Sequence, residues 1–141
     1  MVFGVSAPIG RFVIPKRDVP GRADDLWRTT CFEAFIRIAG EPGYFEWNFA
    51  PSGDWAAYAF SHYREGRVDA EAVSTPYVRI EDNFTLWAVG ATISIPVEPD
   101  LLLGLSAVIE ETGGTKSYWA LAHAPGPPDF HHADCFAARL G

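Results

Sequence analysis

Three glutamates in strand-like stretches are the first residues of this sequence that could hold a ligand. Glu33, Glu46 and Glu110 each lie within or at the end of such a stretch rather than in a loop. Carboxylates are depleted in strands and costly to bury alone, so each must face water, pair with a cation or line a polar pocket. Two carboxylates could also perform glycosidase chemistry, which requires a particular separation between them.

Tryptophans near turns are the second group that could bind a ligand. Trp27 follows a polar loop, Trp55 follows the turn at residues 50–53, and Trp119 follows a glycine-containing turn. A tryptophan in such a place can present its π-face to the apolar hydrogens of a sugar ring, although core packing is the commoner role of this residue. Trp27 and Trp55 are the better candidates.

The histidine-rich segment PDFHHAD contains side chains of the types that bind metals. His131 and His132 lie here with Asp129 and Asp134, but without the HExxH or CxxC spacing that indicates zinc. A loop hydrogen-bonded through its histidines is the favoured interpretation, and a structural metal ion is the alternative. A haem iron would need an axial pair of histidine with methionine, lysine or histidine, and the presence of a single methionine, Met1, weakens that option.

The strands that carry Glu33 and Glu46 are predicted to form a hairpin. Alternation in residues 29–38 gathers four apolar side chains on one face: Phe32, Ala34, Ile36 and Ile38. In residues 44–49 the corresponding face is aromatic: Phe45, Trp47 and Phe49. These two faces are predicted to enter the core, and the glycine-containing connection at residues 39–43 suits a hairpin loop.

Two registers of this hairpin keep both apolar faces on the same side, because a one-residue shift would reverse one of them. The first places Glu33 opposite Asn48 and would build a polar pocket on the face away from the core. The second places Arg37 opposite Glu46, as a cross-strand ion pair contributing at most about 1 kcal/mol. The alternation is compatible with both.

The rest of the chain reads as short strands separated by glycine- and proline-rich turns. The turn at residues 50–53 suits a type I geometry, so residues 55–63 are read as a strand rather than a helix. Other strands are predicted within 2–14 and at 77–80, 84–95, 101–110, 116–123 and 134–140, with Trp47 and Trp87 in the core. The apolar face of residues 101–110 consists of Leu103, Leu105, Ala107 and Ile109. The pattern predicts one all-β domain over residues 1–141, an antiparallel β-sandwich.

Composition narrows the classes of partner. The chain has 141 residues and a formal net charge of -7, which disfavours nucleic acid as a partner. It has no apolar run near the roughly 20 residues that span a bilayer and no signal-peptide pattern, so a cytoplasmic protein without a membrane partner is predicted. Cys31 and Cys135 are expected to be reduced, buried thiols, with a single disulfide as the alternative.

Four segments together resemble the bacterial DOMON-like domains related to family 9 carbohydrate-binding modules: LWRTTCFEAFI, YFEWNFAPSGDWAAYAF, LGLSAVIE and SYWALAHAPGPPDFHHADCFAARL. The resemblance runs from about Leu26 to the C-terminus, and E-x-N-x-x-P-x-G and PDFH are its most specific parts. It implies a jelly-roll-like β-sandwich, whose wider relatives bind sugars or haem in a pocket at one face. The motif positions it implies are Glu33, Glu46, Asn48, Trp55, Glu110, Trp119, His123, Asp129 and His131.

Two departures from the family pattern add expectations. Members usually have another strand or two before the segment that matches FGVSAPIGRFVIP, so an edge strand is expected to be missing here, which favours a homodimer through the exposed edge. The methionine ligand of haem-binding relatives has no counterpart. We therefore predict a non-catalytic domain that binds a saccharide or similar small polar ligand. The alternatives are a haem-binding DOMON variant and an enzyme that uses the glutamates or the His131–His132 cluster.

Overall fold

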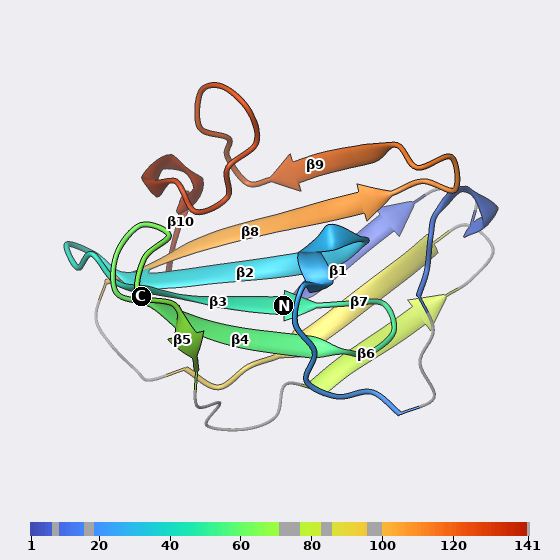
Figure 1. Cartoon of the computed structure of the whole chain (residues 1–141), viewed down its shortest axis with the longest axis horizontal. Helices are drawn as coiled ribbons and strands as arrows, with labels where there is room; N and C mark the ends of the chain where they lie inside the picture. Colours follow the sequence, from blue (N-terminus) through green and yellow to red (C-terminus); the bar gives the residue numbers. More distant parts are fainter. Residues whose placement is uncertain (7–8, 16–18, 71–76, 83–85, 96–99, 141) are drawn as a thin grey trace.

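Ten strands in two antiparallel sheets make up the computed structural model, which describes residues 1–6, 9–15, 19–70, 77–82, 86–95 and 100–140 (Figure 1). The smaller sheet has the order β1-β7-β6, built from β1 (Val2–Ser6), β7 (Leu86–Thr92) and β6 (Tyr77–Asp82). The larger sheet has the order β10-β8-β2-β3-β4-β5, and β9 also pairs with β8.

The strands of the larger sheet are β2 (Cys31–Ile38), β3 (Tyr44–Phe49), β4 (Trp55–Phe60), β5 (Val68–Asp69), β8 (Leu101–Glu110), β9 (Lys116–Ala120) and β10 (Ala138–Leu140). Three single-turn 3-10 helices are η1 (Ile9–Arg11), η2 (Leu26–Arg28) and η3 (Ala133–Cys135). The prediction of an all-β antiparallel fold is confirmed.

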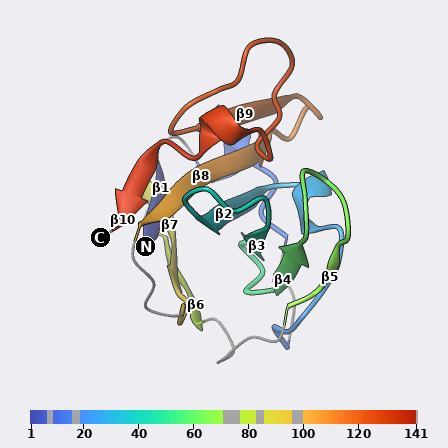
Figure 2. The ribbon, with the colours of Figure 1, turned by 90° about the vertical axis from the view of Figure 1, so that its left-hand side faces the viewer.

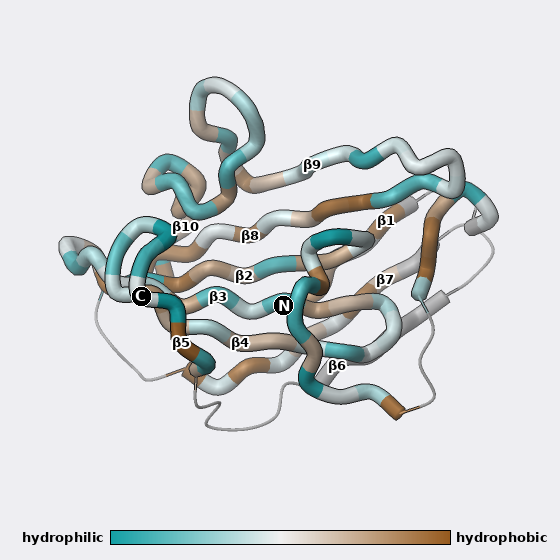
Figure 3. Tube along the Cα trace, viewed as in Figure 1, coloured by the Kyte–Doolittle hydropathy of each residue, from teal (hydrophilic) through white to brown (hydrophobic). Residues whose placement is uncertain are grey.

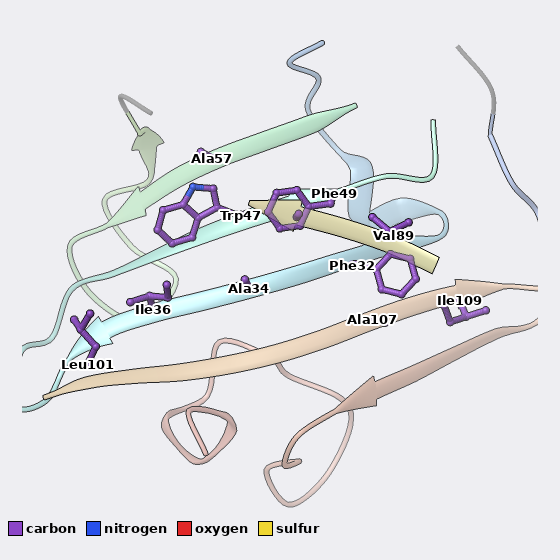
Figure 4. Packing of buried hydrophobic residues seen from close by; sticks show 11 residues of the cluster. Phe32, Ala34, Ile36, Trp47, Phe49, Ala57, Val89, Leu101, Ala107 and Ile109 are labelled. Carbon is purple, nitrogen blue, oxygen red and sulfur yellow. The ribbon is translucent and has the colours of Figure 1, made fainter. Parts of the chain in front are cut away.

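The core lies between the two sheets, because β1, β6 and β7 cover one face of the larger sheet (Figure 2). The apolar side chains that alternation assigned to β2, β3 and β8 meet Val89 and Ala91 of β7 there (Figure 4). Phe32 and Phe49 are almost fully buried in this cluster. Full burial of a side chain of this size stabilises the fold by roughly 1.5–3 kcal/mol, so this face provides much of the driving force for folding.

Two residues predicted for the core face are half-exposed instead. Phe45 is 43% exposed and Ile38 is exposed to a similar degree. Ile38 ends β2 and Phe45 lies near the start of β3, so both are at the rim of the sandwich beside the hairpin loop. Phe45 packs instead against Trp47, with ring centroids 5.7 Å apart. The core assignment of Trp47 is confirmed, and that of Trp87 falls on a side chain outside the described part of the structure.

The turn at residues 50–53 forms as predicted, and residues 55–60 continue from it as a strand. The Gly53 amide donates to the Ala50 carbonyl oxygen at 2.9 Å, and Gly53 has a φ of 88° that favours glycine.

At the C-terminal end the predicted strand over 134–140 is shorter, because residues 133–135 form η3. The amide of Asp134 caps this turn by donating to Nδ1 of His132 at 3.2 Å.

Candidate functional site

The β2–β3 hairpin adopts the register with Glu33 opposite Asn48. On its other side Glu33 faces Ser106 of β8, so three polar side chains lie side by side across the sheet. Glu46 is opposite Phe35, which excludes the alternative cross-strand pair between Arg37 and Glu46. The polar residues face away from the smaller sheet, on what we call the outer face of the larger sheet. Hydrophilic positions accordingly interrupt β2 and β3 in Figure 3.

A pocket of about 750 Å³ opens on this outer face. Its floor is formed by strand residues, namely Glu33, Glu46, Tyr58, Phe60 and Val108. Its walls come from η2, from the β4–β5 loop (residues 61–67), from β9 and from the β9–η3 loop (residues 121–132). Figure 2 shows both loops on the side of the larger sheet opposite to β6 and β7.

Glu33 is buried in the floor with a single hydroxyl partner. Its side chain is 3% exposed, and Ser106 Oγ donates to Glu33 Oε2 at 2.8 Å. Desolvation by burial, followed by repulsion from Glu46, raises the pKa of Glu33 to about 8, although the Ser106 hydrogen bond acts in the opposite direction. At neutral pH this carboxyl group therefore keeps its proton and can both donate and accept a hydrogen bond.

Glu46 is the second buried carboxyl group of the floor, and Asn48 lies beneath it. Asn48 Nδ2 donates to Glu46 Oε1 at 2.8 Å. Burial raises the pKa of Glu46, opposed by this hydrogen bond and then by the charges of Arg67 and Arg64. Asn48 is fully buried, and its Oδ1 has no hydrogen-bond partner among the described atoms. The Asn48 amide therefore orients the Glu46 carboxyl group and leaves Glu46 Oε2 for other contacts.

His131 closes one side of the pocket as a neutral imidazole. Its Nδ1 lies 2.7 Å from the Tyr44 hydroxyl, and its Nε2 lies 3.8 Å from Glu46 Oε2. Burial, and next the charge of Arg64, lowers the pKa of His131 to about 4. The Tyr44 hydroxyl accepts from the Arg64 amide at 3.1 Å, which leaves its own proton for Nδ1. This arrangement favours the tautomer with the proton on Nε2, directed at Glu46.

Asp129 joins the two loops that form the walls. It accepts a hydrogen bond from Arg64 Nη2 at 2.7 Å, another from the Tyr63 hydroxyl, and a third from the His131 amide at 3.2 Å. Partial burial acts to raise the pKa of Asp129, but the hydrogen bonds from Tyr63 and Arg64 lower it below its usual value. Asp129 therefore positions Arg64 and His131 without lining the pocket itself.

The structure brings six of the ten sequence-predicted residues to this site. Trp27, Glu33, Glu46 and His131 line the pocket, Asn48 supports Glu46, and Asp129 joins the walls.

The other four predicted residues lie away from the pocket. Trp55 is on the core face, opposite Phe49, and packs against the core. Trp119 is 63% exposed on the side of β9 opposite to Tyr118. Glu110 ends β8, where its amide donates to Thr30 Oγ1 at 3.1 Å, and His123 is exposed near Phe130.

Several lining residues were not predicted. Tyr58 and Phe60 follow from alternation once residues 55–60 are a strand, because they share a face with Ala56, which is opposite Asn48. The same rule finds Val108 of β8. Arg64 and Arg67 lie in the β4–β5 loop, where side-chain direction follows no periodicity, so no sequence signal could have found them.

The described residues offer few groups that could hold a metal ion or a haem iron. No group of three or more histidine, cysteine or acidic side chains there is arranged to hold a metal ion. His131, the lining histidine, already contacts Tyr44 through Nδ1 and faces Glu46 through Nε2. Met1 does not line the pocket, and its amino group donates to the Ala91 carbonyl oxygen beside the smaller sheet.

The cysteines and the described helices carry no further indication of a function. Cys31 and Cys135 are free, buried thiols. Within the part of the chain that the structure describes, no helix has the length and apolar character needed to cross a bilayer. Comparison of the sequence and fold with protein-family models, curated proteins and solved structures gives no match. Function is therefore inferred from the chemistry of the pocket.

Proposed function

We propose that this chain is a non-catalytic binding domain whose outer-face pocket holds a saccharide or a similar polyhydroxylated molecule. The observation that carries the proposal is the pair of buried carboxyl groups, Glu33 and Glu46, in the floor of a pocket flanked by aromatic rings. The resemblance of the sequence to DOMON-like domains related to family 9 carbohydrate-binding modules supports the same function.

The polar groups of the floor match the needs of sugar hydroxyls. Protonated Glu33 can donate and accept, Glu46 Oε2 can accept, and His131 lines the pocket with its Nε2 lying 3.8 Å from Glu46 Oε2. A sugar hydroxyl both donates and accepts, so neighbouring hydroxyls can pair with these groups together. A ligand without hydroxyls would leave them unpaired, which costs roughly 1–3 kcal/mol for each group.

Aromatic side chains supply the apolar part of the contact. Trp27 of η2 and Tyr118 of β9 line the pocket and are both half-exposed, with Phe130 beside them. Such rings can stack on the apolar face of a pyranose. The volume of about 750 Å³ lies within the usual range for small-molecule sites, and it suits one or two sugar rings.

The environment of the two glutamates favours binding over hydrolysis. A glycosidase needs one protonated acid and one ionised carboxylate, in surroundings that push the two pKa values in opposite directions. Here burial raises the pKa of both Glu33 and Glu46. The hydrogen-bond partner of each is neutral, Ser106 for Glu33 and Asn48 for Glu46, and the nearby charges of Arg67 and Arg64 do not offset the effect of burial on the pKa of Glu46.

Calorimetry with mono- and disaccharides at millimolar concentration tests the proposal. Glu46→Gln keeps the acceptor for Asn48 and removes the carboxylate, so we expect affinity to fall about tenfold or more. Glu110→Gln is the matched control outside the pocket and should bind like the wild type. Trp27→Ala and Trp119→Ala form a second pair, in which only the Trp27 change should weaken binding. Absence of binding to the folded wild type would overturn the proposal.

A further inference from the structure

Cations gather at the pocket of an otherwise acidic protein. The chain has 11 lysines and arginines against 18 acids, and four of the 11 line this pocket: Arg28, Arg64, Arg67 and Lys116. They come from η2, the β4–β5 loop and β9, so they surround the floor. Like charges brought together at a concave surface focus the field there and raise the local concentration of anions.

Two of the four cations lack a carboxylate partner among the described residues. Arg64 pairs with Asp129 at 2.7 Å, and Arg28 with Asp25 at 3.5 Å. The Arg67 guanidinium lies over the Tyr58 ring, 4.9 Å from its centroid, and Lys116 Nζ donates to the Arg28 carbonyl oxygen at 2.5 Å. Neither contact neutralises the positive charge.

Arg67 and Lys116 belong to opposite walls. Lys116 begins β9, and Arg67 precedes β5, which is beyond β4 at the other end of the sheet order. The strands that carry Glu33 and Glu46 run between them. A ligand in the pocket would therefore have acidic hydrogen-bonding groups below it and free cations at both sides.

We propose that the ligand is an anionic saccharide, a sugar that bears a carboxylate or phosphate group. The anionic group lies at the Arg67 or Lys116 wall, and the ring hydroxyls bind Glu33 and Glu46. The inference rests on the proposed saccharide-binding function and adds the charge of the ligand. A guanidinium binds carboxylate and phosphate oxygens through paired N–H groups, whereas an ammonium acts as a point charge.

The floor does not cancel this preference. Glu33 keeps its proton at neutral pH, and the positive charges of Arg67 and Arg64 act on Glu46. A cationic sugar could pair with Glu46, but the four positively charged side chains that line the pocket would repel it. Arg67 and Lys116, the two lining cations without a carboxylate partner among the described residues, therefore outnumber Glu46, the floor carboxyl group left to ionise.

A matched set of glucose derivatives tests the inference: glucose, glucuronate, glucose 6-phosphate and glucosamine, titrated into the full chain by calorimetry. We expect the anions to bind about tenfold or more tightly than glucose, and glucosamine to bind more weakly. Added salt should narrow this gap, because the walls are open to solvent. Comparison of the two anions distinguishes a carboxylate from a phosphate site.

Three results would overturn the inference: glucose binding as tightly as both anions, glucosamine binding most tightly, or inorganic phosphate alone binding as tightly as glucose 6-phosphate. The first two leave the saccharide proposal intact. If none of the sugars binds, the proposed function itself fails.

Variants at the walls localise the effect. Arg67→Gln and Lys116→Met remove the charge at one wall each, and loss of the wall that holds the anionic group should reduce the affinity for the anions by a larger factor than the affinity for glucose. Arg139→Gln is the control, because Arg139 is exposed on β10 and pairs with exposed Asp100 at 3.7 Å. An equal loss in Arg139→Gln would show a general charge effect and would contradict a site at the walls.

Discussion

The two faces of the larger sheet both bury apolar side chains, but only the outer face buries carboxyl and amide groups among them. On the core face, Phe32 and Phe49 pack against the smaller sheet. On the outer face, the same strands bury Glu33, Glu46 and Asn48 beneath loops, with exposures of 3%, 5% and 0%. Apolar side chains on the outer face would avoid the cost of desolvating carboxyl groups. The contrast between the faces is therefore the presence of buried carboxyl groups, which are the basis of the proposed binding site.

The largest expected effect belongs to the core face. Phe49→Ala removes a fully buried ring from the cluster between the sheets and should lower the free energy of unfolding by about 3–5 kcal/mol. Urea unfolding measures this change. If the variant remains folded in dilute buffer, its affinity for a sugar should match that of the wild type. A loss of affinity without a loss of stability would break the division of roles between the two faces.

The outer face should differ in its dependence on pH. Above the usual pKa of 4.5 the unfolded chain has lost the Glu33 proton, whereas the folded chain keeps it up to about pH 8. The folded state binds more protons in this window, so its stability falls as pH rises. Between about pH 6.5 and about pH 9 the wild type should lose about 2 kcal/mol relative to Glu33→Gln.

The titration of His131 sets the pH range in which the stabilities of the wild type and Glu33→Gln are best compared. Its pKa is lowered from 6.5 to about 4, so the unfolded chain binds more protons between these values and stability rises with pH there. That effect is opposite to the one from Glu33 and is complete above about pH 6.5. Urea unfolding curves at several pH values measure both. A constant difference between wild type and Glu33→Gln would contradict the retained proton.

A smaller effect is expected from the hydroxyl that holds the pocket wall. Tyr44→Phe removes the partner of His131 Nδ1 and of the Arg64 amide, and should destabilise the fold by about 1–2 kcal/mol. Sugar affinity should fall as well, because His131 and Arg64 lose their orientation. Tyr118→Phe provides the control, since the Tyr118 ring is half-exposed and should change stability by less than about 0.5 kcal/mol.

The smallest effect is expected outside both faces. Trp119 is exposed at the sheet edge, where its Nε1 donates to Ser117 Oγ at 2.9 Å. Trp119→Ala should change the free energy of unfolding by about 0.5 kcal/mol or less, measured by urea unfolding. A large loss would show that this edge has a partner or packing role that the contrast between the two faces does not include.

Alternation predicted much of the fold, because the period of two identifies the apolar faces of β2, β3 and β8. It limited the β2–β3 register to two choices but could not select between them, since both keep the same parity. The structure has the first of these registers, and β8 on the other edge of β2 places Ser106 beside Glu33. Trp55 was predicted to bind a ligand, but it pairs with Phe49 across the turn, and directly opposite residues of paired strands share a face. Its side chain therefore lies on the core face.

The cationic walls lie beyond sequence reasoning for a different reason. Arg64 and Arg67 reach the pocket through the path of the β4–β5 loop, which depends on contacts such as that of Asp129 with Arg64. Asp129 is 65 residues further along the chain, and no local pattern predicts such a contact.

Mapping of amide chemical shifts by NMR tests most directly whether the outer face is a binding surface. Glucose and glucuronate would be titrated into the isotope-labelled chain. We predict that the largest perturbations cluster at pocket residues such as Glu33, Glu46 and Tyr58, with little change in β1 and β7. Perturbations concentrated on the smaller sheet or at Trp119, or none with either sugar, would contradict the assignment of the pocket as the site.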